Sequence, residues 1–482
     1  MHDGGGATNP VKIFANIFIS FVGAGGLGLP FAFKEAGILE GVLILGFVSV
    51  VSVKAMLMLI DCKYKLEERL DVRRKFKIVS KVKMDDVEGK ELLKNEDTAA
   101  QNGLNGQHGK SSAEETESPK NEIDYGDVGF YALGNKGKVL VDTSIVVSQI
   151  GFSCAYLIFI SSNLVTFVPG LAKHHWVAVM MVPLTLLCLL RHLNRLALFS
   201  LFADFANIFA YSVVFWFDFE HVKNVRIHPK QMSMVGFPFF LGIAFYCYEG
   251  AGMILALESS VLASKRHKFK KIFITALTIV TVLYISFGVC GYLSFGAETE
   301  SIITLNLPPG ILPELVKSCL CFSLFFTYPV MMFPVVSIIE SRLMPDPNKN
   351  EKHGNMLRSA MVLITGLVVI LIPNIATLMA LVGATCCTLL AFILPGLFHM
   401  EIFKESLTRR EWMFDIFLIV MGIIATCLGT WDALKRLFPW LEASSPEVLP
   451  SSLQVPVSDP VGDLIHVAHS VHQSLINGTN QP

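Results

Sequence analysis

The stretch GAGGLGLP (residues 23–30) lies inside the first long apolar segment of the chain, residues 11–33. It holds four glycines within six residues, followed by a proline. Each glycine disfavours an α-helix by about 1 kcal/mol relative to alanine, and the proline removes a further backbone hydrogen bond. Irregular backbone is tolerated within a membrane only where it lines a cavity or is buried in protein. The sequence therefore predicts a membrane-crossing helix that is broken in the middle.

A second apolar segment, residues 235–257, carries a similar interruption, YCYEGAG (residues 246–252). Its Glu249 places a carboxyl near the middle of the segment, and ionisable residues at that depth mark functional sites by default. Each interruption lies about a dozen residues after its segment begins, and five segments separate the two starts. Interrupted segments at corresponding positions of two halves are the sequence sign of an inverted-repeat transporter.

The composition agrees with a protein embedded in a membrane. Of the 482 residues, 52% are hydrophobic and only 16% are charged, whereas soluble domains average about 25% charged. This excludes a disordered chain and a disulfide scaffold, and a net charge of −1 argues against a nucleic-acid binder. We therefore expect an all-α polytopic membrane protein with 11 transmembrane helices in the lipid bilayer. The expected spans are 11–33, 37–60, 138–168, 175–190, 196–217, 235–257, 272–295, 312–340, 357–373, 375–399 and 412–431.

The bias of Lys and Arg toward alternate loops places the N-terminus in the cytosol and, with an odd number of spans, the C-terminus on the other side. Residues 1–60 would hold helices 1 and 2, and residues 125–432 would hold helices 3–11. The polar segment 61–124 between them is expected to be a disordered cytosolic loop. The tail, 433–482, would be non-cytosolic, and its Asn477 begins an Asn-Gly-Thr glycosylation pattern.

Neither a cofactor nor a metal is expected. The letters G-x-G-x-x-G at 23–28 match the dinucleotide fingerprint, but that fingerprint must follow a strand, and here it lies in a membrane-length apolar segment. The ten cysteines form no C-x-x-C pair. No paired carboxylates, Ser/Lys pair or His cluster within a span supports intramembrane catalysis, so the protein is not expected to be an enzyme.

Broken helices offer chemistry that suits a zwitterion. The freed amides at the start of the second half-helix favour a carboxylate, and the freed carbonyls of the first half-helix can take an ammonium or a cation. Close helix packing through small residues is the alternative reading of the glycines. Glu249 could carry a coupling proton or tie the broken backbone together. The candidate substrate-binding residues are Ser20, Gly23, Ala24, Gly25, Gly26, Leu27, Tyr248, Glu249 and Gly250.

Four polar residues are candidates for binding a coupling ion. Asn16 and Ser20 lie one helical turn apart, and Ser323 and Thr327 in the eighth span have the same spacing. Hydroxyls and an amide near the carbonyls of a broken helix could form a cation site. Ordinary hydrogen bonds between helices are the alternative. The ion-coupling candidates are therefore Asn16, Glu249, Ser323 and Thr327.

Four stretches carry a resemblance to a known family. They are FANIFISFVGAGGLGLPFAFKEAG (14–37), YEGAGMILALES (248–259), ITLNLP (303–308) and LVGATCCTLLAFILPGLFH (381–399). Together they resemble the amino acid/auxin permease family from Phe14 to Trp431, and within it the chain is most similar to plant vacuolar exporters of neutral amino acids.

The resemblance implies the five-plus-five inverted-repeat fold of LeuT-like transporters, with helices 1 and 6 broken. It also implies a small neutral amino acid held at Gly23–Leu27 and Tyr248–Gly252. Relatives are often coupled to H+, and some branches bind Na+ between spans 1 and 8, where Asn16, Ser323 and Thr327 stand. Movement from a vacuolar or lysosomal lumen into the cytosol is implied in the same way, with the plasma membrane as the alternative location.

We therefore expect a secondary active transporter that works by alternating access. A channel would need a continuous polar pore, which the paired breaks do not suggest. A sensor of the same fold, signalling through residues 61–124, is the remaining rival. Deleting that segment separates the two: transport should survive if the protein is a transporter, and signalling should be lost if it is a sensor.

Overall fold

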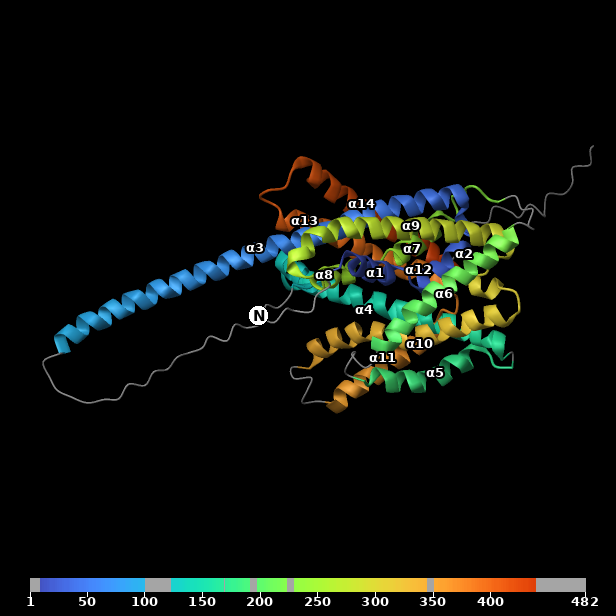
Figure 1. Ribbon diagram of the computed structural model, residues 1–482, viewed down its shortest axis with the longest axis horizontal. Coiled ribbons are helices and arrows are strands. Elements are labelled where there is room, and N and C mark those ends of the chain that lie inside the picture. The colour runs from blue at the N-terminus through green and yellow to red at the C-terminus, as the bar shows by residue number, and fades with distance from the viewer. Residues whose placement is uncertain are drawn as a thin grey trace, which may run out of the picture. The chain divides into compact units, whose positions relative to one another are not determined.

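The computed structural model describes residues 9–99, 123–168, 170–190, 197–222, 229–344 and 351–438. The chain divides into two units, Met1–Leu437 and Phe438–Pro482, and the second lies outside the described residues except for Phe438. The first unit is all-helical (Figure 1). Its α-helices are α1 (Pro10–Phe21), α2 (Leu29–Ala36), α3 (Ile38–Ala99), α4 (Tyr125–Phe167), α5 (Lys173–Cys188), α6 (Ala197–Val222), α7 (Phe237–Cys247), α8 (Ala251–Ser259), α9 (Arg266–Phe295), α10 (Ile311–Leu343), α11 (Glu351–Leu371), α12 (Ile375–Val382), α13 (Leu394–Ile402) and α14 (Arg409–Leu437).

The helices have the length and composition of membrane spans. Among the described residues, eight are long and apolar enough to cross a membrane, or nine if Pro10–Phe21 and Gly25–Ala36 count as one bent span. The prediction of a polytopic helical membrane protein is confirmed at this level. The count of 11 stays a prediction, because α5 has only 16 residues and α6 is not among the eight.

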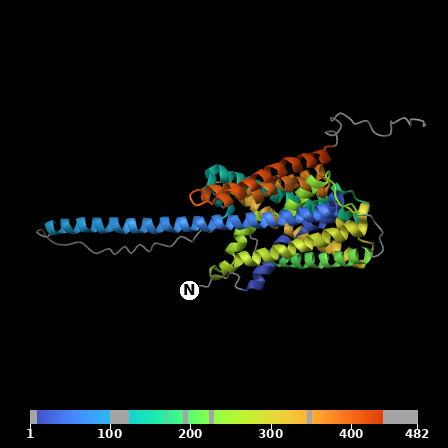
Figure 2. The ribbon, with the colours of Figure 1, turned by 90° about the horizontal axis from the view of Figure 1, so that it is seen from above.

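Helix α3 extends beyond the expected second span. It was expected to end near residue 60, but it continues to Ala99, as the long blue helix of Figures 1 and 2 shows. Residues 61–99 are rich in Leu, Lys, Glu and Arg, which all favour helix formation. The first part of the segment expected to be a loop is therefore helical, and residues 100–122 lie outside the described residues.

The core around the first break is packed through aromatic rings and glycines. Phe33 of α2 is fully buried, and its ring meets that of Phe240 of α7 edge to face, with 5.1 Å between centroids. A Cβ atom at Gly41 of α3 or Gly288 of α9 would lie 2.5 or 2.3 Å from the Phe33 ring. Both glycines are therefore needed for four helices to meet at this ring, and this packing fixes the start of α2.

Candidate functional site

The chain leaves the helical path where the glycine-rich stretch begins. Helix α1 ends at Phe21, Gly23 is extended, and Ala24–Gly28 form a 3-10 helix before α2 starts. The axes of Pro10–Phe21 and Gly25–Ala36 differ by 45°. Gly25 lies in the first turn of the 3-10 helix, and the N–H groups of a first turn have no partner within their own helix.

Two tyrosines from distant helices take up the carbonyls freed at this break. The Tyr211 hydroxyl of α6 donates to the Gly23 carbonyl at 2.8 Å, and the Tyr284 hydroxyl of α9 donates to the Phe21 carbonyl. Gly26 makes this approach possible, because a Cβ there would lie 2.2 Å from the Tyr211 oxygen. Each of these carbonyls also accepts one local amide, Gly23 N–H at 3.0 Å for Phe21 and Gly26 N–H at 3.3 Å for Gly23. The backbone at the break is thus held by local turns together with side chains from α6 and α9.

Tyr211→Phe tests this support of the break. Removing the hydroxyl leaves the Gly23 carbonyl with the Gly26 amide at 3.3 Å as its donor, and we expect a loss of about 1 kcal/mol of stability, the usual net value of one hydrogen bond. The measurement is the midpoint of unfolding of purified protein in detergent. Tyr131→Phe is the matched control, because the Tyr131 side chain is exposed. Equal midpoints for the two variants would contradict the assigned role.

The second interruption lies between α7 and α8. Helix α7 ends at Cys247, and Tyr248, Glu249 and Gly250 connect it to the start of α8. A Cβ at Gly250 would lie 2.2 Å from the Phe21 ring of α1, so glycine is required for the two interruptions to approach each other. The Tyr248 hydroxyl donates to Thr281 Oγ1 at 2.8 Å and anchors the link to α9.

Glu249 is a buried carboxyl at the start of α8. Its side chain is 7% exposed, and its Oε1 accepts a hydrogen bond from the Gly252 amide at 3.3 Å. This contact places the carboxyl against the N-terminal turn of α8, where the positive end of the helix dipole favours a negative group. The carboxyl also borders a cavity, so it can meet a ligand there.

That cavity joins the two interruptions. It has a volume of about 70 Å³, several times the ~10–15 Å³ that one water molecule needs. Ser20, Gly23 and Gly25 line it from the first interruption, and Tyr246, Cys247 and Glu249 line it from the second. The remaining lining residues are Phe21, Gln149, Phe152, Tyr156, Met253, Tyr284 and Met331.

Four of the nine predicted substrate-binding residues meet in this cavity, namely Ser20, Gly23, Gly25 and Glu249. Four others belong to the same two interruptions but do not line the cavity, namely Gly26, Leu27, Tyr248 and Gly250. Packing accounts for two of these positions, since Gly26 faces Tyr211 and Gly250 faces Phe21. The ninth, Ala24, belongs to the first interruption, and its side chain lies outside what the structure describes.

The remaining ion-coupling candidates lie away from the cavity lining. Asn16 is exposed, and its carbonyl accepts the Ser20 hydroxyl at 2.7 Å. The Ser323 hydroxyl donates to the Ala203 carbonyl of α6 at 3.3 Å, and the Thr327 hydroxyl donates to the Ser323 carbonyl at 2.9 Å. An ion site at Asn16, Ser323 and Thr327 stays a prediction. Asn477 lies outside the described residues.

The cavity residues of α4, α9 and α10 are not among the predicted site residues. Gln149 is the one that carries a signal, because it is a polar residue within an apolar segment. Its Oε1 is buried, and among the described residues it has no hydrogen-bond partner. Phe152, Tyr156, Tyr284 and Met331 are indistinguishable in the sequence from ordinary core residues, so only the fold reveals them.

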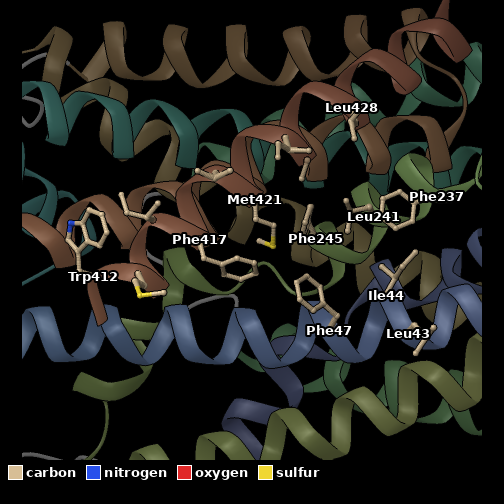
Figure 3. Close-up of a pocket in the computed structure, with 15 residues that line it drawn as sticks. Leu43, Ile44, Phe47, Phe237, Leu241, Phe245, Trp412, Phe417, Met421 and Leu428 are labelled. Atoms are coloured by element: carbon tan, nitrogen blue, oxygen red, sulfur yellow. The ribbon is translucent and has the colours of Figure 1, made fainter. Parts of the chain in front are cut away.

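A larger hollow lies elsewhere, along α14 (Figure 3). It has a volume of about 750 Å³ and lies between α14, α3 and α7, with Phe47, Phe245 and Phe417 among its walls. All of its 15 lining side chains are aliphatic, aromatic or methionine. A zwitterion placed there would lose its hydration without gaining ionic partners, which is costly. The small cavity at the two interruptions is therefore the better candidate for a charged substrate.

Over the part of the chain that the structure describes, no three His, Cys, Asp or Glu side chains gather where they could ligate an ion.

Comparison with a solved structure gives only a weak likeness. The chain matches the substrate-bound, outward-open state of a Na+-coupled sialic acid symporter with a TM-score of 0.42 and 9% sequence identity. The match covers 89% of this chain and 98% of that one. A TM-score at this level supports no inference about mechanism.

Comparisons of sequence are much stronger. Amino acid transporter AVT3C of Arabidopsis thaliana is 33% identical over 450 residues, covering 89% of this chain and 91% of that protein. Amino acid transporter ANT1 of the same plant is 32% identical over 453 residues, covering 89% and 93%. Vacuolar amino acid transporter 3 of Schizosaccharomyces pombe is 24% identical over 320 residues, covering 64% and 48%.

The family match decides the assignment. Residues 6–84 and 110–435 match the family described as Transmembrane amino acid transporter protein. This match confirms the predicted family, and the family and the named relatives are transporters rather than enzymes. The chain therefore belongs to the transmembrane amino acid transporter family.

Proposed function

We propose that the protein is a secondary active transporter that moves small neutral amino acids across a membrane by alternating access, coupled to protons. We further propose that it works in a vacuolar or lysosomal membrane and carries its substrate from the lumen to the cytosol. The name of the fission-yeast relative, a vacuolar amino acid transporter, supports this location.

The observation that carries the proposal is the cavity shared by the two interruptions. It brings Gly23 and Gly25 of one segment together with Glu249 of the other, although the two segments are far apart in the chain. In our proposal the substrate carboxylate lies on the amides near Gly25–Leu27, and the substrate ammonium lies on carbonyls of the two interruptions. Both charges of a free amino acid then find partners at one site.

The proposed architecture is the five-plus-five inverted repeat. In it, α1 with α2 forms the first span, and α7 with α8 forms the sixth. Helices α5 and α6 would be the fourth and fifth spans, which gives 11 in total. The order of elements along the chain supports this assignment, because five spans would then separate the start of one interrupted span from the start of the next.

The tyrosine contacts suggest how the site opens and closes. Tyr284 and Tyr211 donate to the Phe21 and Gly23 carbonyls, which are the acceptors that a substrate ammonium would use. The hydroxyls and the ammonium therefore compete for the same oxygens. We propose that substrate binding displaces at least one hydroxyl and so loosens α6 or α9 from the first interruption.

The test is transport by the purified chain in proteoliposomes. Uptake of a panel of amino acids is measured with an imposed proton gradient, with an imposed sodium gradient and with neither. Saturable uptake of small neutral amino acids that follows the proton gradient, with counterflow when no gradient is imposed, is expected. Uptake driven only by sodium would contradict proton coupling. Substrate binding without any flux would contradict the transporter and favour a sensor.

Glu249→Gln tests whether this carboxyl carries a proton. The amide keeps the shape of the neutral acid but cannot bind or release a proton. If Glu249 carries the coupling proton, uptake by the variant becomes nearly independent of pH between about 5 and 8 while counterflow continues, because exchange needs no net proton movement. The measurement is initial uptake against pH beside the wild type. An unchanged pH profile would assign Glu249 a structural role at the start of α8.

A further inference from the structure

Asp218 of α6 is a buried carboxyl with no partner among the described residues. Its side chain has 0% exposure, and neither Oδ1 nor Oδ2 has a hydrogen-bond partner. Its main-chain carbonyl, in contrast, accepts the Ser294 hydroxyl of α9 at 2.8 Å. The backbone is thus fixed to α9 while the carboxyl is left without a donor. Buried polar groups without partners are rare in proteins and call for a specific explanation.

The carboxyl lies where α2, α6 and α9 meet. A Cβ built on Gly291 of α9 would lie 3.4 Å from Asp218 Oδ2 and 2.6 Å from Cγ of Pro30 in α2. The glycine therefore leaves just enough room for the carboxyl and the proline ring on either side. Pro30 follows directly on the first interruption, whose Gly25 lines the candidate substrate site. A tilt of α2 would move Pro30 and change the surroundings of Asp218.

No charged group in the described ranges compensates Asp218. Cys290 of α9 is the nearby titratable side chain that interacts with it electrostatically. On the other faces, the charged groups are engaged elsewhere or lie in solvent. The Lys34 ammonium of α2 donates to the Thr299 carbonyl, Lys317 of α10 interacts with Glu314 and Cys321, Glu35 of α2 pairs with Arg436, and Glu220 of α6 is exposed.

The ligand that fits a single buried carboxyl is a proton. An ionised carboxylate without partners in a protein interior is very costly, whereas the neutral acid costs far less. A metal cation needs several oxygen ligands at once, and neither carboxylate oxygen here has even one polar neighbour within hydrogen-bond reach. This packing therefore favours the neutral acid form of Asp218.

We propose that Asp218 binds the coupling proton, holds it while α2 packs against α6 and α9, and releases it when α2 tilts away and water reaches the carboxyl. This inference rests on the proposed proton-coupled function and adds the residue that carries the proton. It also gives the coupling a physical route, because Pro30 links the position of α2 to the site at Gly25. Glu249 then interacts with the substrate, and the two carboxyls have separate roles.

The test compares wild type, Asp218→Asn and Glu220→Gln in proteoliposomes. Three quantities are measured for each: accumulation driven by a proton gradient, substrate-induced proton movement reported by a trapped pH dye, and counterflow without a gradient. For Asp218→Asn we expect accumulation to fall about tenfold or more and the dye signal to vanish, with counterflow kept, because coupling is lost but exchange is not. Glu220→Gln removes an exposed carboxyl of the same helix and should match the wild type.

Each outcome bears on one claim. The wild type alone reports on the proposed function, since a wild type without proton-driven uptake refutes that proposal whatever the variants do. With a proton-driven wild type, an Asp218→Asn variant that accumulates substrate and moves protons normally overturns the inference. Asp218→Glu restores a carboxyl and should restore the dye signal. Loss of counterflow in both Asp218 variants would show a structural role and would also overturn it.

Discussion

Gly25→Val is expected to abolish amino-acid transport without preventing insertion into the membrane. A Cβ at Gly25 would already lie 3.2 Å from two carbons of the Tyr246 ring and 3.5 Å from Cys247 Sγ. The ring has little freedom to retreat, because Phe152 packs against it with 4.6 Å between centroids. Valine adds two further carbons in a cavity of about 70 Å³, so the substrate carboxylate loses its place. A loss of about 100-fold in uptake is expected from such a displacement.

The measurement is initial uptake in proteoliposomes at matched amounts of inserted protein. Gly46→Val in α3 is the matched control, because a Cβ at Gly46 has no atom within 4 Å, and it tests whether valine in a membrane helix is itself harmful. Gly25→Ala, with a single added carbon, should lie between the wild type and Gly25→Val. Uptake at the wild-type level by Gly25→Val would remove Gly25 from the substrate site.

The sequence predicts those features of the site that depend on local chemistry. Glycines and a proline weaken a helix wherever they stand, so the irregular backbone at 23–28 could be predicted without a structure. A carboxyl in an apolar segment is equally visible, and Glu249 does line the cavity. Both signals are properties of a few neighbouring residues, and no knowledge of the fold is needed to read them.

The partners of the broken backbone could not be predicted, because they come from other helices. Tyr211 and Tyr284 each stand among several other aromatic residues in a long apolar segment. Nothing near them in the sequence shows that their hydroxyls reach Gly23 and Phe21. The same holds for Asp218. It follows directly on the expected span 196–217, and only the packing against α2 and α9 shows that it is buried.

The charged stretch after residue 60 is another place where local sequence does not reveal a long-range contact. Charge and low hydrophobicity predict a loop from residue 61, and this loop includes Lys63. The structure instead continues the helix and buries Lys63 against Glu258 of α8, 195 positions away in the chain. A pair formed over such a separation leaves no trace in the local pattern of either segment.

The Lys63–Glu258 pair is the most completely buried ion pair among the described residues, with side-chain exposures of 1% and 0%. Lys63 Nζ lies 2.6 Å from Glu258 Oε2, and the Tyr64 hydroxyl donates to Oε1 at 2.7 Å. Arg266 Nε, at the start of α9, lies 3.3 Å from the same Oε1. Glu258 therefore joins the C-terminal end of α8 to both α3 and α9.

Glu258→Ala is expected to lower the free energy of unfolding by about 3–5 kcal/mol, because it leaves the Lys63 ammonium buried without its counter-ion. The double variant Lys63→Met with Glu258→Leu removes both charges and should be more stable than Glu258→Ala alone, since no buried charge is left over. The measurement is unfolding by a denaturing detergent, followed by loss of helix signal.

Glu68→Gln is the matched control for this comparison. Glu68 pairs with Lys65 at 2.9 Å on the same helix, but the two side chains are 65% and 32% exposed, so its loss should cost less than about 1 kcal/mol. A Glu258→Ala variant no less stable than Glu68→Gln would mean that Lys63 finds other partners or water. Since α8 begins beside Glu249 and ends one residue after Glu258, a loosened C-terminal end would also release the start of the helix. Substrate affinity should therefore fall together with stability in Glu258→Ala, and both should recover in the double variant. A purely local effect at Lys63 would leave substrate affinity unchanged.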